Sequence, residues 1–215
     1  MGVENIKPYR IGKVKLSSDV AEYSFEDMQV FTLNDKKSPD QKVILYIHGG
    51  AHTHQPLAFH FRFMDHMAQT LNAKIIAPIY PKVPNFNYQH TYPRLLNLYR
   101  EILESIKNPE QLTLMGDSAG GNISLSFAHY IQMNHLPQPK DIILLSPCVD
   151  MVLDNPVLFD YVTRDPMLAV EGYDVIHQGI AHNTFVYPKV NHVFVLFPIP
   201  EAQDAKRKMI DIINS

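Results

Sequence analysis

Ser118 lies within the pattern Gly-x-Ser-x-Gly that residues 116–120 form. An apolar run, residues 112–115, precedes this pattern, and a stretch that favours a helix, residues 123–133, follows it. A strand, a sharp turn and a helix in this order present a serine hydroxyl at the end of a sheet, because small residues let the backbone turn tightly. The pattern also arises by chance in turns rich in glycine and serine. The flanking strand and helix favour the interpretation of Ser118 as a nucleophile.

A glycine-containing loop directly follows another short apolar run, residues 43–47. Backbone amides in such a loop approach a substrate closely, since no large side chain intervenes, and they stabilise a developing oxyanion. The N–H of the residue after the nucleophile is the usual second source of donors. The alternative interpretation of residues 48–51 is an ordinary strand-to-helix turn. Because these residues follow a strand upstream of the Ser118 motif, an oxyanion hole is favoured. The predicted oxyanion and binding residues are His48, Gly49, Gly50, Ala51 and Ala119.

His192 is the predicted general base among the eleven histidines. It lies in a turn that follows a short strand, residues 184–187, and precedes the last helix, where a catalytic base belongs in an α/β protein. His52 and His54 form a His-x-His pair, which is also found in metal sites. No third ligand is evident near them, so no metal site is predicted.

The elements that must position these residues follow from the hydrophobic pattern. Short apolar runs predict buried strands, and apolar residues at helical spacing predict amphipathic helices. Residues 10–33 are expected to form one or two leading strands, and residues 81–93 a loop. The predicted strands are residues 43–47, 74–79, 112–115, 141–145 and 184–187, and the helices are residues 57–71, 95–106, 123–133, a short one ending near 178, and 201–213. This alternation predicts a three-layer α/β fold with a mostly parallel sheet, in a single domain over residues 1–215.

Composition narrows the class of protein. The 215 residues are 46% hydrophobic and 19% charged, and the formal net charge is −3. This is the balance of a globular protein, without the basic surface that nucleic acid or an anionic membrane requires. The single cysteine, Cys148, suits a reducing compartment, and neither a signal-peptide pattern nor a membrane-spanning run is present. We therefore expect a cytoplasmic protein without nucleic-acid or membrane partners, in which the last helix is a candidate homodimer surface.

These motifs resemble those of the α/β-hydrolase family, in its hormone-sensitive-lipase-like branch of bacterial esterases with a His-Gly-Gly-Gly-type loop. The matching pieces are residues 48–51, residues 116–122, Ser146-Pro147 with Asp150, residues 165–168 and residues 192–194. The resemblance implies a hydrolase of carboxylic esters, an esterase or lipase that takes a small-molecule ester, with short acyl chains as the usual substrates. It also implies a serine nucleophile with an oxyanion hole and no cofactor.

The sequence departs from the family in three places. Ala51 stands where the family has a third glycine, and residues 80–86 only loosely match the family's Tyr-Arg-Leu-Ala-Pro-Glu segment. The third departure concerns the catalytic acid, which the family places on a loop after a further strand and before a further helix. Ser118 and His192 are only 74 residues apart, which is too few to include this strand, loop and helix. The sequence reads as though this unit had been deleted near residues 178–180.

Asp150 is the candidate replacement acid, since it follows the strand that ends in Ser146-Pro147. In the alternative interpretation Asp150 only orders its loop, and no acid orients the histidine. Two functions therefore remain open: a carboxylic-ester hydrolase that acts through an acyl-enzyme, or a shortened, weak or inactive hydrolase-like protein that binds a small acyl ligand.

Overall fold

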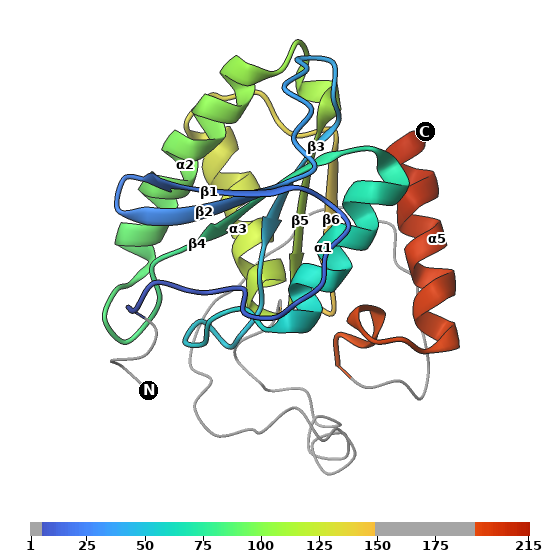
Figure 1. The fold of residues 1–215 in the computed structure, drawn as a ribbon. Helices are drawn as coiled ribbons and strands as arrows, with labels where there is room; N and C mark the ends of the chain where they lie inside the picture. Colours follow the sequence, from blue (N-terminus) through green and yellow to red (C-terminus); the bar gives the residue numbers. More distant parts are fainter. Residues whose placement is uncertain (1–5, 149–191) are drawn as a thin grey trace, which may run out of the picture.

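A six-stranded sheet forms the centre of the structure (Figure 1), a computed structural model that describes residues 6–148 and 192–215. Within these residues the strand order is β1-β2-β4-β3-β5-β6. The strands are β1 (Val20–Phe25), β2 (Met28–Leu33), β3 (Val43–Ile47), β4 (Lys74–Ile79), β5 (Leu112–Asp117) and β6 (Asp141–Leu145). The residues predicted as one or two leading strands form the hairpin β1–β2, which joins the sheet antiparallel to β4.

Strands β4, β3, β5 and β6 run parallel to one another. The carboxyl ends of parallel strands meet at one edge of a sheet, and loops at that edge form ligand sites in α/β proteins. The last pair in the register between β3 and β5 is Ile47 with Gly116. The loop after β3 and the turn after β5 therefore begin side by side.

Helices cover both faces of the sheet (Figure 1). Helices α1 (Ala58–Leu71) and α5 (Pro200–Asn214) pack on one face, and α2 (Tyr88–Ser105) and α3 (Ala119–Met133) on the other. Along β3, Tyr46 belongs to the core on the α1 side, whereas Leu45 belongs to the core on the α2 side. All five residues of β3 are buried, which explains its unbroken apolar run. The predicted three-layer α/β arrangement with a mostly parallel sheet is confirmed.

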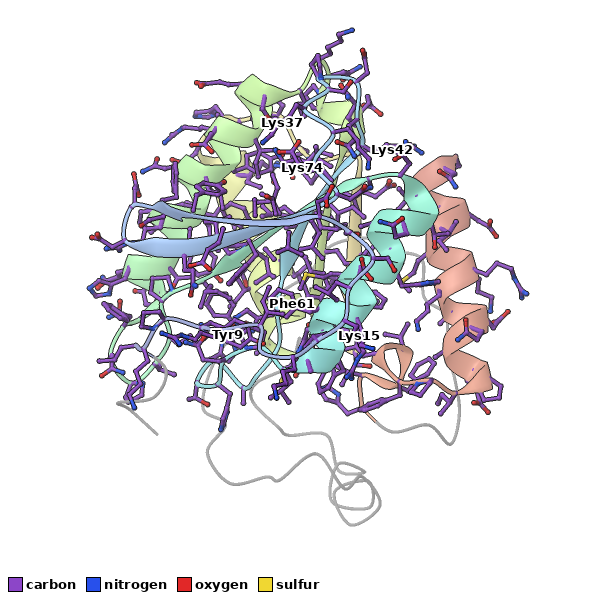
Figure 2. The ribbon with its side chains drawn as sticks, viewed as in Figure 1. Tyr9, Lys15, Lys37, Lys42, Phe61 and Lys74 are labelled. Atoms are coloured by element: carbon purple, nitrogen blue, oxygen red, sulfur yellow. The ribbon has the colours of Figure 1, made fainter. Side chains whose placement is uncertain are left out.

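The amino-terminal segment closes the α1 face of the core. The Tyr9 ring stacks on Phe61 of α1 (Figure 2) with 5.4 Å between centroids. Each of these two rings also makes a T-shaped contact with Phe31 on β2. These contacts hold the first turns of α1 against the sheet, close to the edge where β3 and β5 end.

Two helices begin several residues before their predicted starts. Helix α2 begins at Tyr88, so the prediction of a loop over residues 81–93 is wrong for its last six residues. The Asn87 side chain accepts a hydrogen bond from Gln89 N–H and caps the helix, and Pro93 inside the helix lacks the N–H of one backbone hydrogen bond. Helix α3 begins at Ala119, directly after Ser118, rather than at residue 123. The predicted helix that ends near residue 178 and the predicted strand over residues 184–187 lie outside the described residues.

None of the helices in the described ranges combines the length and the apolar character that crossing a membrane requires.

Candidate active site

Ser118 occupies a strained turn between β5 and α3. Its backbone has φ 50° and ψ −120°, outside the regions that residues other than glycine ordinarily adopt. The Ser118 N–H donates to the carbonyl of Leu145 at 2.9 Å, and its own carbonyl accepts from Asn122 N–H at 3.1 Å. These bonds hold the serine at the amino end of α3, where the first helical N–H groups, that of Ala119 among them, have no partner within the helix. We call residues 116–120 the elbow.

Close packing keeps the elbow in this shape. A Cβ atom at Gly120 would collide with the backbone carbonyl of Ile47 on β3. Helix α3 can approach β3 this closely only because residue 120 has no side chain. The contact presses the first turn of α3 against the sheet and leaves Ser118 at the tip of the turn.

His192 lies against Ser118. The distance from His192 Nε2 to Ser118 Oγ is 2.8 Å, so the hydroxyl can donate its proton to a neutral imidazole. The neighbouring Val193 is buried at φ 50°, and its N–H donates to Ser146 Oγ at 3.2 Å, just beyond the end of β6. The short helix η2 (Phe194–Leu196) follows and packs into the core on the α1 side. His192 is thus placed by the carboxyl end of β6.

The loop after β3, residues 48–53, lies beside the elbow, and we call it the oxyanion loop. Its first peptide unit is held at both ends: Tyr80 Oη donates to the carbonyl of His48 at 2.9 Å, and Gly49 N–H donates to Asp117 Oδ1 at 2.8 Å. A Cβ atom at Gly49 would collide with the Asp117 carboxylate, so only glycine fits. The Gly49 amide is therefore an anchor of the loop.

Further hydrogen bonds orient the next two peptide units. The His48 Nδ1 atom lies 2.5 Å from the carbonyl of Gly49, which orients the peptide that carries Gly50 N–H. The carbonyl of Gly50 accepts from the N–H groups of Thr53 and His54 at 3.0 and 2.8 Å, which orients the peptide that carries Ala51 N–H. Gly50 (φ 125°) and Ala51 (φ 50°) both have positive φ. Their N–H groups meet no acceptor among residues 6–148 and 192–215.

Asp117 connects the elbow to the oxyanion loop and to α1. Its side chain is only 2% exposed, and Tyr46 Oη donates to the same Oδ1 atom at 2.7 Å. His60 Nε2 lies 3.3 Å from Oδ2, while His60 Nδ1 accepts from Leu57 N–H at 2.9 Å, so the ring carries its proton on Nε2 and donates it to the carboxylate. Burial and the Asp117 charge raise the pKa of Tyr46 well above its ordinary value, so Tyr46 stays a donor.

Sequence reasoning missed this role of Asp117 and of His60. From the sequence, His60 on its predicted helix is interpreted as either a surface histidine or a hydrogen-bonded one. The surface alternative is wrong, because its side chain is 3% exposed. The one signal in the sequence that could have indicated a buried His60 is its position directly before Phe61, at the start of the apolar face of the helix.

A small cleft lies beside the elbow and the oxyanion loop. Its volume is about 70 Å³, and its lining includes His52 of the oxyanion loop, Asn122 of α3 and Tyr88 of α2. Burial lowers the pKa of His52, which favours its neutral form. The described residues contain no group of three His, Cys, Asp or Glu side chains that could hold a metal ion.

The structure brings five predicted residues to the carboxyl edge of the sheet: Ser118, His192, Gly50, Ala51 and Ala119. His48 and Gly49 hold the loop rather than face outward. The predicted acid, Asp150, lies outside the described residues.

Comparisons with known proteins agree with this arrangement. The alpha/beta hydrolase fold family matches residues 44–196. A protein from Acinetobacter venetianus named as an esterase is 27% identical over 141 residues, which cover 66% of this chain and 46% of that protein. A crystal structure of a presumed esterase from Staphylococcus aureus is 25% identical, with a TM-score of 0.87 over 99% of this chain and 89% of that one. Another, an esterase from the bacterial hormone-sensitive lipase family, has a TM-score of 0.66 at 22% identity, over 74% of this chain and 54% of that one.

The chain belongs to the α/β-hydrolase fold family. Its resemblance to the hormone-sensitive-lipase-like branch, which the motifs predict, is confirmed by the relatives and by the fold. The chain spans less than half the length of the curated relatives that it matches.

Proposed function

We propose that this chain hydrolyses carboxylic esters through an acyl-enzyme formed on Ser118. The observation that carries the proposal is the 2.8 Å contact between His192 Nε2 and Ser118 Oγ, on a turn flanked by uncommitted backbone N–H groups. A nucleophile within hydrogen-bond reach of a base, next to oriented donors, is the arrangement that acyl transfer needs.

Acylation begins when Ser118 Oγ attacks the ester carbonyl carbon and His192 Nε2 takes the hydroxyl proton. The carbonyl oxygen becomes an oxyanion, and the N–H groups of Gly50, Ala51 and Ala119 stabilise it. The imidazolium then gives its proton to the alcohol oxygen as the bond from carbon to that oxygen breaks. The alcohol leaves, and the acyl group stays on Ser118.

Deacylation repeats these steps with water. His192 takes a proton from a water molecule as its oxygen attacks the acyl carbon, and the same N–H groups hold the second oxyanion. When the bond to Ser118 Oγ breaks, His192 returns the proton to the serine, and the carboxylic acid is released. The residues named here complete this cycle without a metal or an organic cofactor.

Asp150 remains the proposed acid that orients His192. In serine proteases, replacement of the orienting acid by its amide leaves the histidine in the wrong tautomer and lowers kcat by about 10⁴. The contributions of the oxyanion hole and of substrate binding persist. A slow enzyme is therefore the expected result if Asp150 serves only to order its loop.

Short acyl groups are the proposed substrates, as the resemblance to the hormone-sensitive-lipase-like branch implies. We therefore expect acetyl esters to be hydrolysed with a higher kcat/KM than octanoyl esters of the same alcohol. Cytoplasmic location and a homodimer through α5 remain proposals from the sequence.

The test compares wild-type protein with Ser118→Ala in a p-nitrophenyl acetate assay. Loss of the nucleophile should reduce the rate to the buffer background, because the surrounding N–H groups cannot form an acyl-enzyme. A fluorophosphonate probe should label the wild type and leave Ser118→Ala unlabelled. Equal hydrolysis by both proteins, together with no labelling of the folded wild type, would rule out serine catalysis and favour the non-catalytic alternative.

A further inference from the structure

Lys82 is a buried cation beside the oxyanion loop. Its side chain is 3% exposed, and its Nζ donates to the carbonyl of Tyr80 at 2.9 Å. No carboxylate lies within ion-pair distance of it among the residues that the structure describes. A lysine buried without a counter-charge is costly, and such groups concentrate at functional sites. Burial lowers the pKa of Lys82 to about 7, so its charge changes in the neutral range.

The segment that contains Lys82, residues 80–83, supports the oxyanion loop at two points. Tyr80 Oη donates to the carbonyl of His48, and Val83 N–H donates to the carbonyl of His52 at 3.1 Å. The Tyr80 ring also stacks on the His48 imidazole with 4.6 Å between centroids. Lys82 Nζ lies 4.6 Å from the centroid of the same tyrosine ring. The ammonium group and the imidazole thus share one aromatic neighbour.

His48 has one satisfied and one unsatisfied ring nitrogen. Nδ1 is within hydrogen-bond distance of the carbonyl of Gly49, which can only accept, so Nδ1 carries the proton. Nε2 is buried, and it has no hydrogen-bond partner among the described residues. Burial first, then the charge of Lys82 and the neighbouring His60, keeps the pKa of His48 well below its ordinary value, so the ring is neutral. Its Nε2 therefore presents an unused lone pair.

Other ionisable groups surround this pair. Tyr80 Oη and Lys82 belong to the same segment, and the remaining groups come from five other places in the fold. They are His52 of the oxyanion loop, His60 of α1, Tyr46 of β3, Asp117 of β5 and Tyr92 of α2. Of these, Asp117 is the one carboxylate, and its oxygens are engaged by Tyr46, Gly49 and His60.

We propose that the charged form of Lys82 holds His48 in the tautomer that carries its proton on Nδ1, and so positions the Gly50 N–H that receives the oxyanion. A cation favours a lone pair on the free ring nitrogen and disfavours a proton there. The Nδ1 proton bonds the carbonyl of Gly49, and that carbonyl belongs to the same planar peptide as Gly50 N–H. If the proton moved to Nε2, two lone pairs would face each other at Nδ1 and the carbonyl oxygen, and the peptide would rotate. Lys82 is thus a positioning residue that acts through His48.

A dependence of turnover on pH follows. His192 must be neutral to accept a proton, so kcat falls on the acidic side as His192 is protonated. Lys82 must be charged, so kcat falls again on the alkaline side as Lys82 loses its proton. The two groups together give a bell-shaped profile.

The test rests on the proposed ester hydrolysis and uses Lys82→Met, Lys82→Arg and a matched surface control, Lys107→Met. For Lys82→Met we expect kcat at pH 6.5 to fall roughly tenfold, with KM little changed, and the alkaline limb to disappear. Lys82→Arg should keep the acidic limb and move the alkaline limb beyond the measurable range, because arginine stays charged. Lys107 is exposed and pairs only with Asp40 at the surface, so Lys107→Met should leave the profile as in the wild type.

A second measurement needs no turnover. Nitrogen-15 NMR of histidine-labelled protein reports which ring nitrogen of His48 carries the proton, with the signal assigned from its loss in His48→Asn. The wild type should show Nδ1–H at pH 6.5, and Lys82→Met should show Nε2–H or a mixture. The inference is overturned if the folded Lys82→Met protein retains the wild-type tautomer, or if an active wild type and Lys82→Met share one pH profile. An inactive, unlabelled wild type would refute the proposed function, and the tautomer measurement would still test Lys82.

Discussion

The elbow and the oxyanion loop bring backbone N–H groups to one edge of the sheet, and each contains residues at positive φ. Both contain hydrogen bonds and a glycine without room for a side chain, but the partners differ. In the elbow, Gly120 lies against the backbone carbonyl of Ile47 on β3, whereas in the oxyanion loop Gly49 lies against the Asp117 side chain. Hydrogen bonds from distant parts of the chain hold the oxyanion loop, chiefly from Asp117 and Tyr80.

This difference separates two ways to preorganise a site. Steric constraint acts through repulsion, so a single added methyl group should break the elbow. Hydrogen bonds act through geometry and charge, so the oxyanion loop should respond to substitutions that preserve shape and to pH. The loop is therefore the more adjustable half of the candidate site. Three predictions test this contrast.

The largest effect is expected from Gly120→Ala. Its Cβ would overlap the backbone of β3, which cannot move without disturbing the parallel strands, and we expect a loss of about 4 kcal/mol in the free energy of unfolding. Urea denaturation measures this loss. Gly12→Ala is the control, because Gly12 has nothing within 4 Å of an added Cβ, and the strain from its positive φ should cost about 1 kcal/mol. Equal midpoints for the two variants would show that packing does not hold the elbow.

The second effect concerns Lys82 and stability. The folded-state pKa of Lys82, about 7, lies below its ordinary 10.5, so between these values the unfolded chain binds more protons and stability rises with pH. Below pH 7 the buried charge carries its full cost. Lys82→Met should therefore be more stable than the wild type at pH 6, by on the order of 3 kcal/mol, and the difference should shrink towards pH 10.

Thermal unfolding across this pH range measures the difference, with Lys107→Met as the control for removal of a surface lysine. A constant difference between wild type and Lys82→Met at all pH values would contradict the assigned ionisation. If the prediction holds, the charged form that we propose for turnover is also the less stable form, as expected of a functional residue that is costly to bury.

The smallest effect is expected from Asp117→Asn. The amide oxygen can still accept from Gly49 and Tyr46, but the amide N–H₂ would face His60 Nε2–H, and two donors would meet in a buried place. We expect a loss of about 2 kcal/mol in the free energy of unfolding and a fall in kcat as the loop shifts.

Chemical denaturation and the ester assay measure both quantities. Tyr46→Phe is the matched comparison, since it removes one donor and leaves Gly49 N–H on the carboxylate, at a cost of about 1 kcal/mol. If Asp117→Asn left both stability and kcat unchanged, side-chain hydrogen bonds would not be what holds the oxyanion loop.

Much of the fold was predictable because the central strands are buried on both faces. The runs over residues 43–47 and 74–79 agree with the observed strands β3 and β4, since a strand covered by helices on both sides needs apolar residues almost without interruption. The start of α2 was missed because a proline near a helix start looks like a loop signal, whereas the capping residue Asn87 allows the helix to begin before it.

The candidate site was predictable to the extent that its chemistry is local. The elbow motif names Ser118 directly, and His192 is marked by its place before the last helix. The roles of Asp117 and His60, and the proposed role of Lys82, were not visible in the sequence. Each depends on a segment far away in the chain: Gly49 for Asp117, Asp117 for His60 and, through the Tyr80 ring, His48 for Lys82.

The sequence by itself determined the layered α/β fold, the serine at the elbow and the glycines of the oxyanion loop, because burial pattern and tight turns are properties of neighbouring residues. Only the tertiary structure decided which loop amides are used to anchor the loop and which stay available, because that depends on partners brought together by the register of β3 and β5. The same folding buries Lys82 beside the oxyanion loop. There the loss of water makes its charge costly and lowers its pKa to about 7.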